Sequence, residues 1–159
     1  MAHLYTANVR WTRGEETFLD RRYSRAHEWR FDGGIIVPAS ASPSVVRLPL
    51  SREDAVDPEE ALLAAASSCH MLTFLDFAAR AGLRVDSYED DATATMGPRP
   101  DGRIAILKIV LKPAIVFSGD KRPDADALAD LHHKAHETCF IANTLNCEMA
   151  IEPAPPVFA

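Results

Sequence analysis

Cys69 lies near the middle of the longest apolar run of the chain, which extends from Asp57 to Leu75. A second cysteine, Cys139, lies in another stretch of helical character far along the sequence. A thiol reacts as its thiolate, and two thiols can be joined and separated again by exchange with a dithiol. Two cysteines on two helices therefore indicate thiol redox chemistry. Three pairings stay open, because Cys147 competes with Cys139, although its place at the start of an expected strand favours a structural role.

Burial works against reactivity at Cys69. An apolar setting raises the pKa of a thiol, and a buried cysteine commonly acts as a small hydrophobic side chain. A cationic group must therefore reach Cys69 if this residue is a nucleophile. His70 is adjacent, but successive helical residues point about 100° apart, so the two side chains do not share a face. Arginines do gather near the N-terminus, a pattern usually typical of a solvated surface: Arg13, Arg21, Arg22, Arg25 and Arg30.

A group of histidines invites comparison with a zinc site. His132 and His136 are four residues apart and share a helix face, and Cys139 follows one turn later. No glutamate follows the first histidine as in metalloprotease helices, and no second cluster of ligands accompanies the pair. We therefore expect His132, His133 and His136 to lie on a solvated helix face, and we expect no metal and no other cofactor.

Composition limits the class of protein. The chain has 159 residues, of which 47% are hydrophobic and 25% charged, which fits one domain over 1–159 with its own core. The net charge of −6 argues against a general nucleic-acid binder. The N-terminal residues lack the pattern of a signal peptide, and polar residues interrupt the apolar run, so we expect no membrane span. Cysteines in odd number, outside a secreted scaffold, favour a cytoplasmic protein.

The pattern of apolar residues predicts an α+β fold with mostly antiparallel strands. Asp57 and Pro58 are good first residues for a helix, and Gly82 is a natural end for it. This helix is apolar nearly all round, which is typical of a central, buried helix. The expected elements are strands over 4–12 and 17–31, a loop over 38–57, a helix over 57–82, strands over 84–96 and 103–117 joined by a turn, a helix from 123–124 to about 139, and a strand over 147–151.

Asp57-Pro58-Glu59-Glu60 followed by Ala65-Ala66-Ser67-Ser68-Cys69-His70 resembles the signature helix of the OsmC/Ohr family, the osmotically inducible and organic-hydroperoxide-resistance proteins. In that family a Pro-Glu pair precedes the reactive cysteine by ten residues, as Glu59 precedes Cys69. Cys139 matches the second family cysteine. One OsmC-like subgroup is similar at Tyr23-Ser24-Arg25-Ala26-His27, at Phe31-Asp32-Gly33-Gly34 and at Tyr88-Glu89-Asp90.

The resemblance implies a thiol-dependent peroxidase that reduces organic hydroperoxides, with hydrogen peroxide as a further candidate substrate. It implies antiparallel sheets packed around two long central helices in an intertwined homodimer. Cys69 would be the peroxidatic cysteine and Cys139 the resolving one, and a dithiol, of lipoyl type or another thiol, would restore both. The alternative is a non-enzymatic relative that binds a small apolar ligand in the dimer.

The family also holds an arginine with the glutamate of its Pro-Glu pair, and this arginine stabilises the thiolate and orients the peroxide. Glu59 fills the glutamate position. Arg25 is the first choice for the arginine, and Arg30 is the second choice and a candidate for substrate binding. His27 and His70 are further candidates for lining the substrate site, and His70 departs from branches that often carry an aromatic residue there.

The spacing of Glu59 and Cys69 adds a physical constraint. Ten residues of continuous helix rise about 15 Å, so both side chains cannot contact one small substrate. Either the helix begins after Glu59 with an irregular entry, or the site is completed across a dimer.

Overall fold

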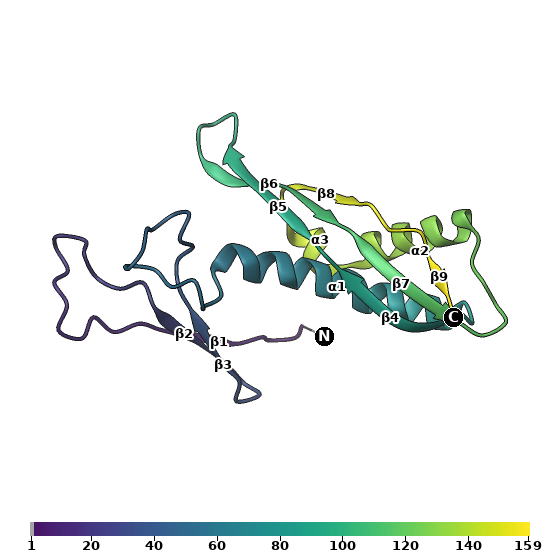
Figure 1. Ribbon diagram of the computed structural model, residues 1–159, viewed down its shortest axis with the longest axis horizontal. Coiled ribbons are helices and arrows are strands. Elements are labelled where there is room, and N and C mark those ends of the chain that lie inside the picture. The colour runs from purple at the N-terminus through teal and green to yellow at the C-terminus, as the bar shows by residue number, and fades with distance from the viewer. Residues whose placement is uncertain (1) are drawn as a thin grey trace. The chain divides into compact units, whose positions relative to one another are not determined.

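The computed structural model describes residues 2–159, which divide into two compact units, one up to Ala61 and one over Leu62–Ala159 (Figure 1). The first unit is a three-stranded antiparallel sheet of β1 (Ala7–Arg10), β2 (His27–Phe31) and β3 (Ile36–Ala39) in that order. The expected strand over 4–12 is shorter, and of the expected strand over 17–31 only the last part is extended. β3 was not expected, although Gly33 and Gly34 before a β-branched run mark the hairpin that forms it.

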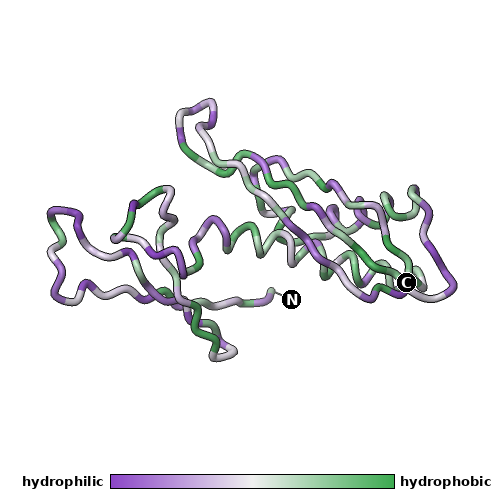
Figure 2. The backbone as a smooth tube through the Cα atoms, in the orientation of Figure 1, coloured by the Kyte–Doolittle hydropathy of each residue, from purple (hydrophilic) through white to green (hydrophobic). Residues whose placement is uncertain are grey.

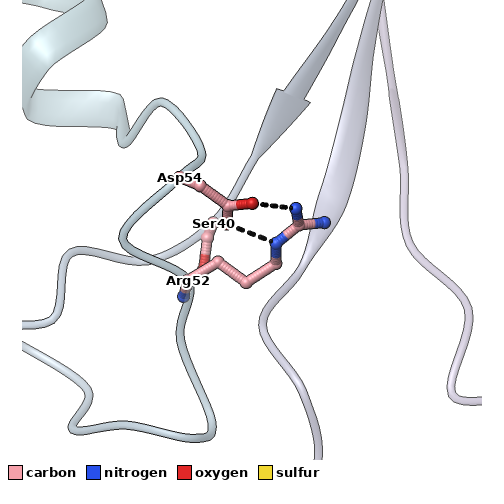
Figure 3. Close-up of polar contacts among 3 residues, drawn as sticks. All are labelled: Ser40, Arg52 and Asp54. Atoms are coloured by element: carbon pink, nitrogen blue, oxygen red, sulfur yellow. Dashed lines mark hydrogen bonds and ion pairs between the residues drawn. The ribbon is translucent and has the colours of Figure 1, made fainter.

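The expected loop before the long helix runs over residues 40–57 and is fixed at several points. Ser40 is fully buried, and its Oγ accepts a hydrogen bond from the backbone N–H of Arg52 at 3.0 Å. The guanidinium of Arg52 makes two hydrogen bonds to the carboxylate of Asp54, at 2.8 and 2.6 Å (Figure 3). Backbone bonds tie Val56 to Pro38 and Ser40. This loop is therefore an ordered part of the first unit.

A capping box begins the long helix α1 (Pro58–Arg80). The Asp57 carboxylate accepts from the N–H of Glu60 at 2.8 Å, and the Glu60 carboxylate accepts from the N–H of Asp57 at 3.2 Å. At the other end Gly82 has φ +73°, and the N–H of Leu83 bonds back to the carbonyl of Ala78. Both predicted ends are confirmed. Since α1 is continuous from Pro58, the irregular entry considered for Glu59 is wrong.

In the second unit, the predicted hairpin is confirmed but each long strand is divided in two. The first arm of the hairpin consists of β4 (Arg84–Asp90) and β5 (Thr93–Pro98), and the second arm consists of β6 (Ile104–Leu111) and β7 (Pro113–Ser118). β5 pairs with β6 and β4 pairs with β7, both antiparallel. The Asp90 carboxylate explains the division, because one of its oxygens accepts from the N–H of Lys112 at 2.6 Å and the other accepts from the Ser67 hydroxyl on α1. β8 (Glu148–Ile151) adds to β6 and β9 (Val157–Phe158) adds to β7, both in parallel.

The second predicted helix is also divided, into α2 (Ala125–Thr138) and α3 (Phe140–Thr144), with Cys139 at the junction. Asp124 is the N-cap of α2 and accepts from the N–H of Ala127 at 2.8 Å. The main core of the second unit lies between α1, α2 and the sheet of β4, β7 and β9. Phe74, Phe117 and Leu131 are among its residues. The class is α+β, as expected.

One face of α1 is buried in the single chain rather than the whole helix. Ala66, His70, Phe74 and Ala78 form this face, whereas Leu72 is 62% exposed. Figure 2 shows that hydrophobic residues run along much of the helix. Over residues 2–159, α1 alone is long and apolar enough to cross a membrane, a test that the core helix of a folded protein also passes. The expected absence of a membrane span therefore stays a prediction.

Replacing Asp57 with alanine is expected to lower the free energy of unfolding by about 1 kcal/mol, because α1 loses its N-cap acceptor. Asp54→Ala is the matched control, since it removes an exposed carboxylate from the same loop, and its urea unfolding midpoint should stay close to the wild-type midpoint. Equal losses in the two variants would contradict the capping role of Asp57.

Candidate functional site

Two polar contacts hold the turn of α1 that carries Cys69. Ser67 bonds to Asp90 of β4, and His70 Nε2 lies 3.1 Å from His132 Nδ1 of α2. The Thr73 hydroxyl donates to the Cys69 carbonyl at 2.8 Å, which is a common helical contact. Cys69 itself is half-buried and is a free thiol. The flanking contacts therefore determine the direction in which its side chain points.

Cys139 lies at the junction of α2 and α3 and is fully buried. Its backbone N–H closes α2 on the carbonyls of Ala135 and His136, and its Sγ accepts from the N–H of Ala142 at 3.4 Å. Burial, and next the side-chain interaction with the Cys69 thiol, raise the pKa of Cys139 to about 11. The Cys69 thiol on α1 thus acts on the Cys139 thiol at the junction of α2 and α3.

Cys147 packs in an apolar cluster of the second unit. It is a half-buried free thiol just before β8, packed against the cluster of Ala66, Ile109 and Leu111. This location fits the structural role that the sequence favours for it.

The histidines of α2 do not all lie on a solvated face, so that expectation is wrong for His132. His132 is 4% exposed, stacks on Phe74 with ring centroids 4.5 Å apart and bonds to His70, which is fully buried. Only His133 is as expected, exposed beside Glu137 at 3.4 Å. Among residues 2–159, no three His, Cys, Asp or Glu side chains are arranged to hold a metal ion.

Burial lowers the pKa of both paired histidines to about 4. At His70 the neighbouring His132 and His136 lower the pKa further, whereas Asp90 acts in the opposite direction. Both rings are therefore neutral near pH 7, and one donates its proton to the other across the 3.1 Å bond.

The first unit contains an aromatic pocket that includes Arg25. Trp11, Phe18 and Tyr23 pack on one another with ring centroids 4.7 to 6.0 Å apart, and the Arg25 guanidinium lies 3.9 Å from the centre of the Tyr23 ring. Arg25 also donates to the backbone carbonyls of Arg21 and Tyr23. The pocket has a volume of about 360 Å³ and is mainly apolar, and His27 and Pro58 also line it.

The other predicted residues of the first unit have different surroundings. Arg30 pairs with Glu28 at 2.7 Å and lines a separate, more polar cavity of about 450 Å³. Both ring nitrogens of His27 are engaged, Nδ1 with the carbonyl of Arg25 at 2.8 Å and Nε2 with the indole N–H of Trp29 at 3.0 Å. Glu59 is half-buried in the first turn of α1. Its predicted bond to an arginine stays a prediction, as do the substrate contacts of Arg30, His27 and His70.

A family model for OsmC-like proteins matches residues 51–154, which include α1, both thiols and every strand from β4 to β8. The chain belongs to the OsmC-like protein family. The match places Cys69 and Cys139 in the family's common region, whereas the aromatic pocket of the first unit lies mostly before it.

Solved structures of OsmC-like proteins share the fold. An OsmC-like protein of unknown function from Vibrio cholerae is 49% identical, with a TM-score of 0.95 over 96% of this chain and 100% of that one. An organic hydroperoxide resistance protein from Elizabethkingia anophelis is 20% identical, with a TM-score of 0.67 over 97% of this chain and 99% of that one. In sequence, protein YmaD of Bacillus subtilis is 28% identical over 102 residues, which are 62% of this chain and 67% of that protein.

Several residues of the site were not predicted from the sequence. Ser67 and Asp90 are part of the matching motifs, but their mutual bond was not foreseen, and His132 was expected in solvent. A signal for His132 does exist, since it shares a helix face with Leu128 and Ala135, which are both buried.

The paired histidines predict that acid destabilises this protein. Their depressed pKa values mean that the unfolded chain binds more protons than the folded one between pH 6.5 and about 4. Their contribution to stability is complete above pH 6.5 and is lost as the pH falls towards 4. His132→Phe should reduce the slope of unfolding free energy against pH in this range, measured by urea unfolding. The exposed neighbour variant His133→Phe should keep the wild-type slope, and an unchanged slope in His132→Phe would contradict the assignment.

Proposed function

We propose that this OsmC-like protein is a thiol-dependent peroxidase that reduces organic hydroperoxides. The observation that carries the proposal is that, besides burial, the Cys69 thiol on α1 raises the pKa of Cys139, a buried thiol at the junction of α2 and α3. Two cysteines can pass between a dithiol and a disulfide when their Cα atoms come within about 7 Å of each other. The likeness in fold to proteins named for organic hydroperoxide resistance agrees with this chemistry.

In the first step, the Cys69 thiolate attacks one peroxide oxygen and the O–O bond breaks. Cys69 becomes a sulfenic acid, and the alkoxide takes a proton and leaves as the alcohol. In the second step, the Cys139 sulfur attacks the Cys69 sulfur, an S–S bond replaces the S–O bond, and the hydroxide leaves as water with the proton of Cys139. A dithiol then reduces the disulfide through a mixed disulfide and becomes oxidised itself.

The environments of the two thiols support this division of roles. Cys139 is fully buried and its raised pKa keeps it a thiol at neutral pH, so it is a poor first nucleophile towards peroxide. Cys69 is half-buried and therefore more accessible to a substrate. We assign Cys69 as the peroxidatic cysteine and Cys139 as the resolving cysteine.

Arg25 is our choice for the cation that stabilises the Cys69 thiolate. Its guanidinium bonds to neutral carbonyl groups and lines an apolar pocket, so its charge is available to an anion and an organic group can lie beside it. The charge of Arg30 is already balanced by Glu28. An apolar pocket of this size suits the alkyl or aryl part of a hydroperoxide better than hydrogen peroxide.

We further propose that the protein acts as a homodimer. Leu72 on α1 and Phe140 on α3 are 62% and 78% exposed, and a second copy would cover such residues. Glu59 and Cys69 are ten residues apart on one continuous helix, so a Glu59 that acts in the site would serve the thiol of the other copy.

The thiol assignments predict different fates for three serine variants. Cys69→Ser should lose turnover of cumene hydroperoxide with dithiothreitol or dihydrolipoamide as reductant. Cys139→Ser should react once, accumulate the Cys69 sulfenic acid and become over-oxidised in excess peroxide. Cys147→Ser is the control and should keep wild-type turnover. Full turnover in Cys69→Ser would rule out the mechanism.

The choice of arginine predicts a difference between two matched variants. Arg25→Gln should slow oxidation of Cys69 by cumene hydroperoxide about 100-fold, because a charge-assisted contact to the reacting atoms is lost. Arg30→Gln should slow it by less than about threefold. Single-turnover kinetics measure both, and a larger loss in Arg30→Gln would transfer the assignment to Arg30.

A further inference from the structure

A buried hydrogen bond joins α1, which carries Cys69, to α2, which ends just before Cys139. His70 Nε2 and His132 Nδ1 are 3.1 Å apart, the two ring planes differ by 5°, and the side chains are 0% and 4% exposed. Within residues 2–159, no other side-chain hydrogen bond connects these two helices. The bond is therefore the specific polar contact that relates one helix to the other.

The positions of the two histidines connect this bond to both cysteines. His70 follows Cys69 directly on α1, and His132 on α2 lies seven residues, or about two turns, before Cys139, the residue that caps α2. Seven residues return to nearly the same helix face, so His132 and Cys139 both belong to the side of α2 that faces α1. A shift of α2 along or around α1 would change the His70–His132 distance and the distance between the sulfurs together.

An apolar pair would fill this place in the core more simply. The two neutral rings satisfy one nitrogen each, which leaves His70 Nδ1 and His132 Nε2 buried without a partner among residues 2–159. Such unpaired polar atoms weaken a core, whereas a phenylalanine and a leucine would pack there without this penalty. The histidine pair fixes the relative position of α1 and α2. A hydrogen bond between two rings tolerates little displacement, whereas hydrophobic contacts tolerate more.

Formation of a disulfide is sensitive to such displacement. The Cα atoms of the two cysteines must come within about 4.4 to 6.8 Å, with the side chains directed at each other. The second step of the peroxidase reaction also has a competitor, since the sulfenic acid of Cys69 can be oxidised further by another peroxide. Correct register of α1 and α2 therefore decides whether Cys139 attacks before that happens.

We propose that His70 and His132 are positioning residues for the resolving step, which hold α2 in the register that presents Cys139 to the Cys69 sulfenic acid. This inference rests on the proposed function. The pair transfers no atoms or electrons: the Cys139 sulfur displaces hydroxide from the Cys69 sulfur, and the proton of Cys139 completes the water that leaves.

Variants of His132 can separate this role from simple packing. His132→Phe keeps a ring against Phe74 but removes the nitrogen that contacts His70. His132→Asn is the rescue variant, because the asparagine amide is as many bonds from Cβ as Nδ1 is in histidine. His133→Asn is the matched control on the exposed side of α2.

The experiment mixes each reduced protein, in a Cys147→Ser background, with one equivalent of cumene hydroperoxide. Samples are quenched over time with dimedone and an alkylating agent, and mass spectrometry measures the Cys69 sulfenic acid and the Cys69–Cys139 disulfide. We expect oxidation of Cys69 at the wild-type rate in every variant. Disulfide formation should be about ten- to a hundredfold slower in His132→Phe, should recover in His132→Asn and should be unchanged in His133→Asn.

The possible failures are distinguishable. If Cys69 forms neither sulfenic acid nor disulfide in the parent protein, the proposed function fails. If Cys69 is oxidised and His132→Phe closes the disulfide at the parent rate, the positioning role is overturned. If His132→Phe does not fold, His70→Leu and its rescue His70→Gln test the other half of the pair. The glutamine amide is as many bonds from Cβ as Nε2 is, and failure of His70→Leu to slow the disulfide would also overturn the proposal.

Discussion

The orientation of α1 about its own axis is the constraint on which the thiol site depends. The helix carries apolar residues on most sides, so hydrophobic packing alone would accept more than one rotation, and each residue of error turns the Cys69 side chain by about 100°. Two polar contacts remove this freedom, Ser67 with Asp90 on the β4 side and His70 with His132 on the α2 side. Asp90 also accepts a hydrogen bond from the N–H of Lys112, where the strand of β6 and β7 is interrupted. One carboxylate therefore binds both α1 and the place where the long hairpin is divided.

Burial then separates two thiols that are chemically identical in the unfolded chain. Cys139 ends α2 and is enclosed, which raises its pKa and keeps it protonated, and the N–H of Ala142 opposes this effect only partly. Cys69 occupies a half-buried place on a helix whose other face is uncovered in the single chain. This difference suits the proposed reaction, in which the accessible Cys69 reacts with the peroxide and the buried Cys139 reacts only with the sulfenic acid of Cys69.

The sequence predicted the features that depend on nearby residues. Asp57 and Gly82 set the ends of α1 through local hydrogen bonds, and the turn after β5 folds the hairpin as expected. The divisions at Asp90 and Cys139 could not be read from local pattern, since the first depends on bonds to residues 22 and 23 positions away. The prediction of a solvated His132 is wrong because it relied on the polar side chain rather than on the helix face that His132 occupies. The hydrogen-bond partner that stabilises His132 in the core, His70, lies 62 residues away in the sequence. The expectation that Cys69 pairs with Cys139 came from the family resemblance, because spacing alone left Cys147 as a competitor.

The most direct test of the account is the pattern of cysteine oxidation after a single turnover. The fully reduced wild-type protein would be treated with one equivalent of an organic hydroperoxide, alkylated and mapped by peptide mass spectrometry under non-reducing conditions. The account predicts a Cys69–Cys139 disulfide, with Cys147 alkylated as a free thiol. Cys69 and Cys139 that both remain reduced, or a disulfide that joins Cys69 to Cys147, would contradict it.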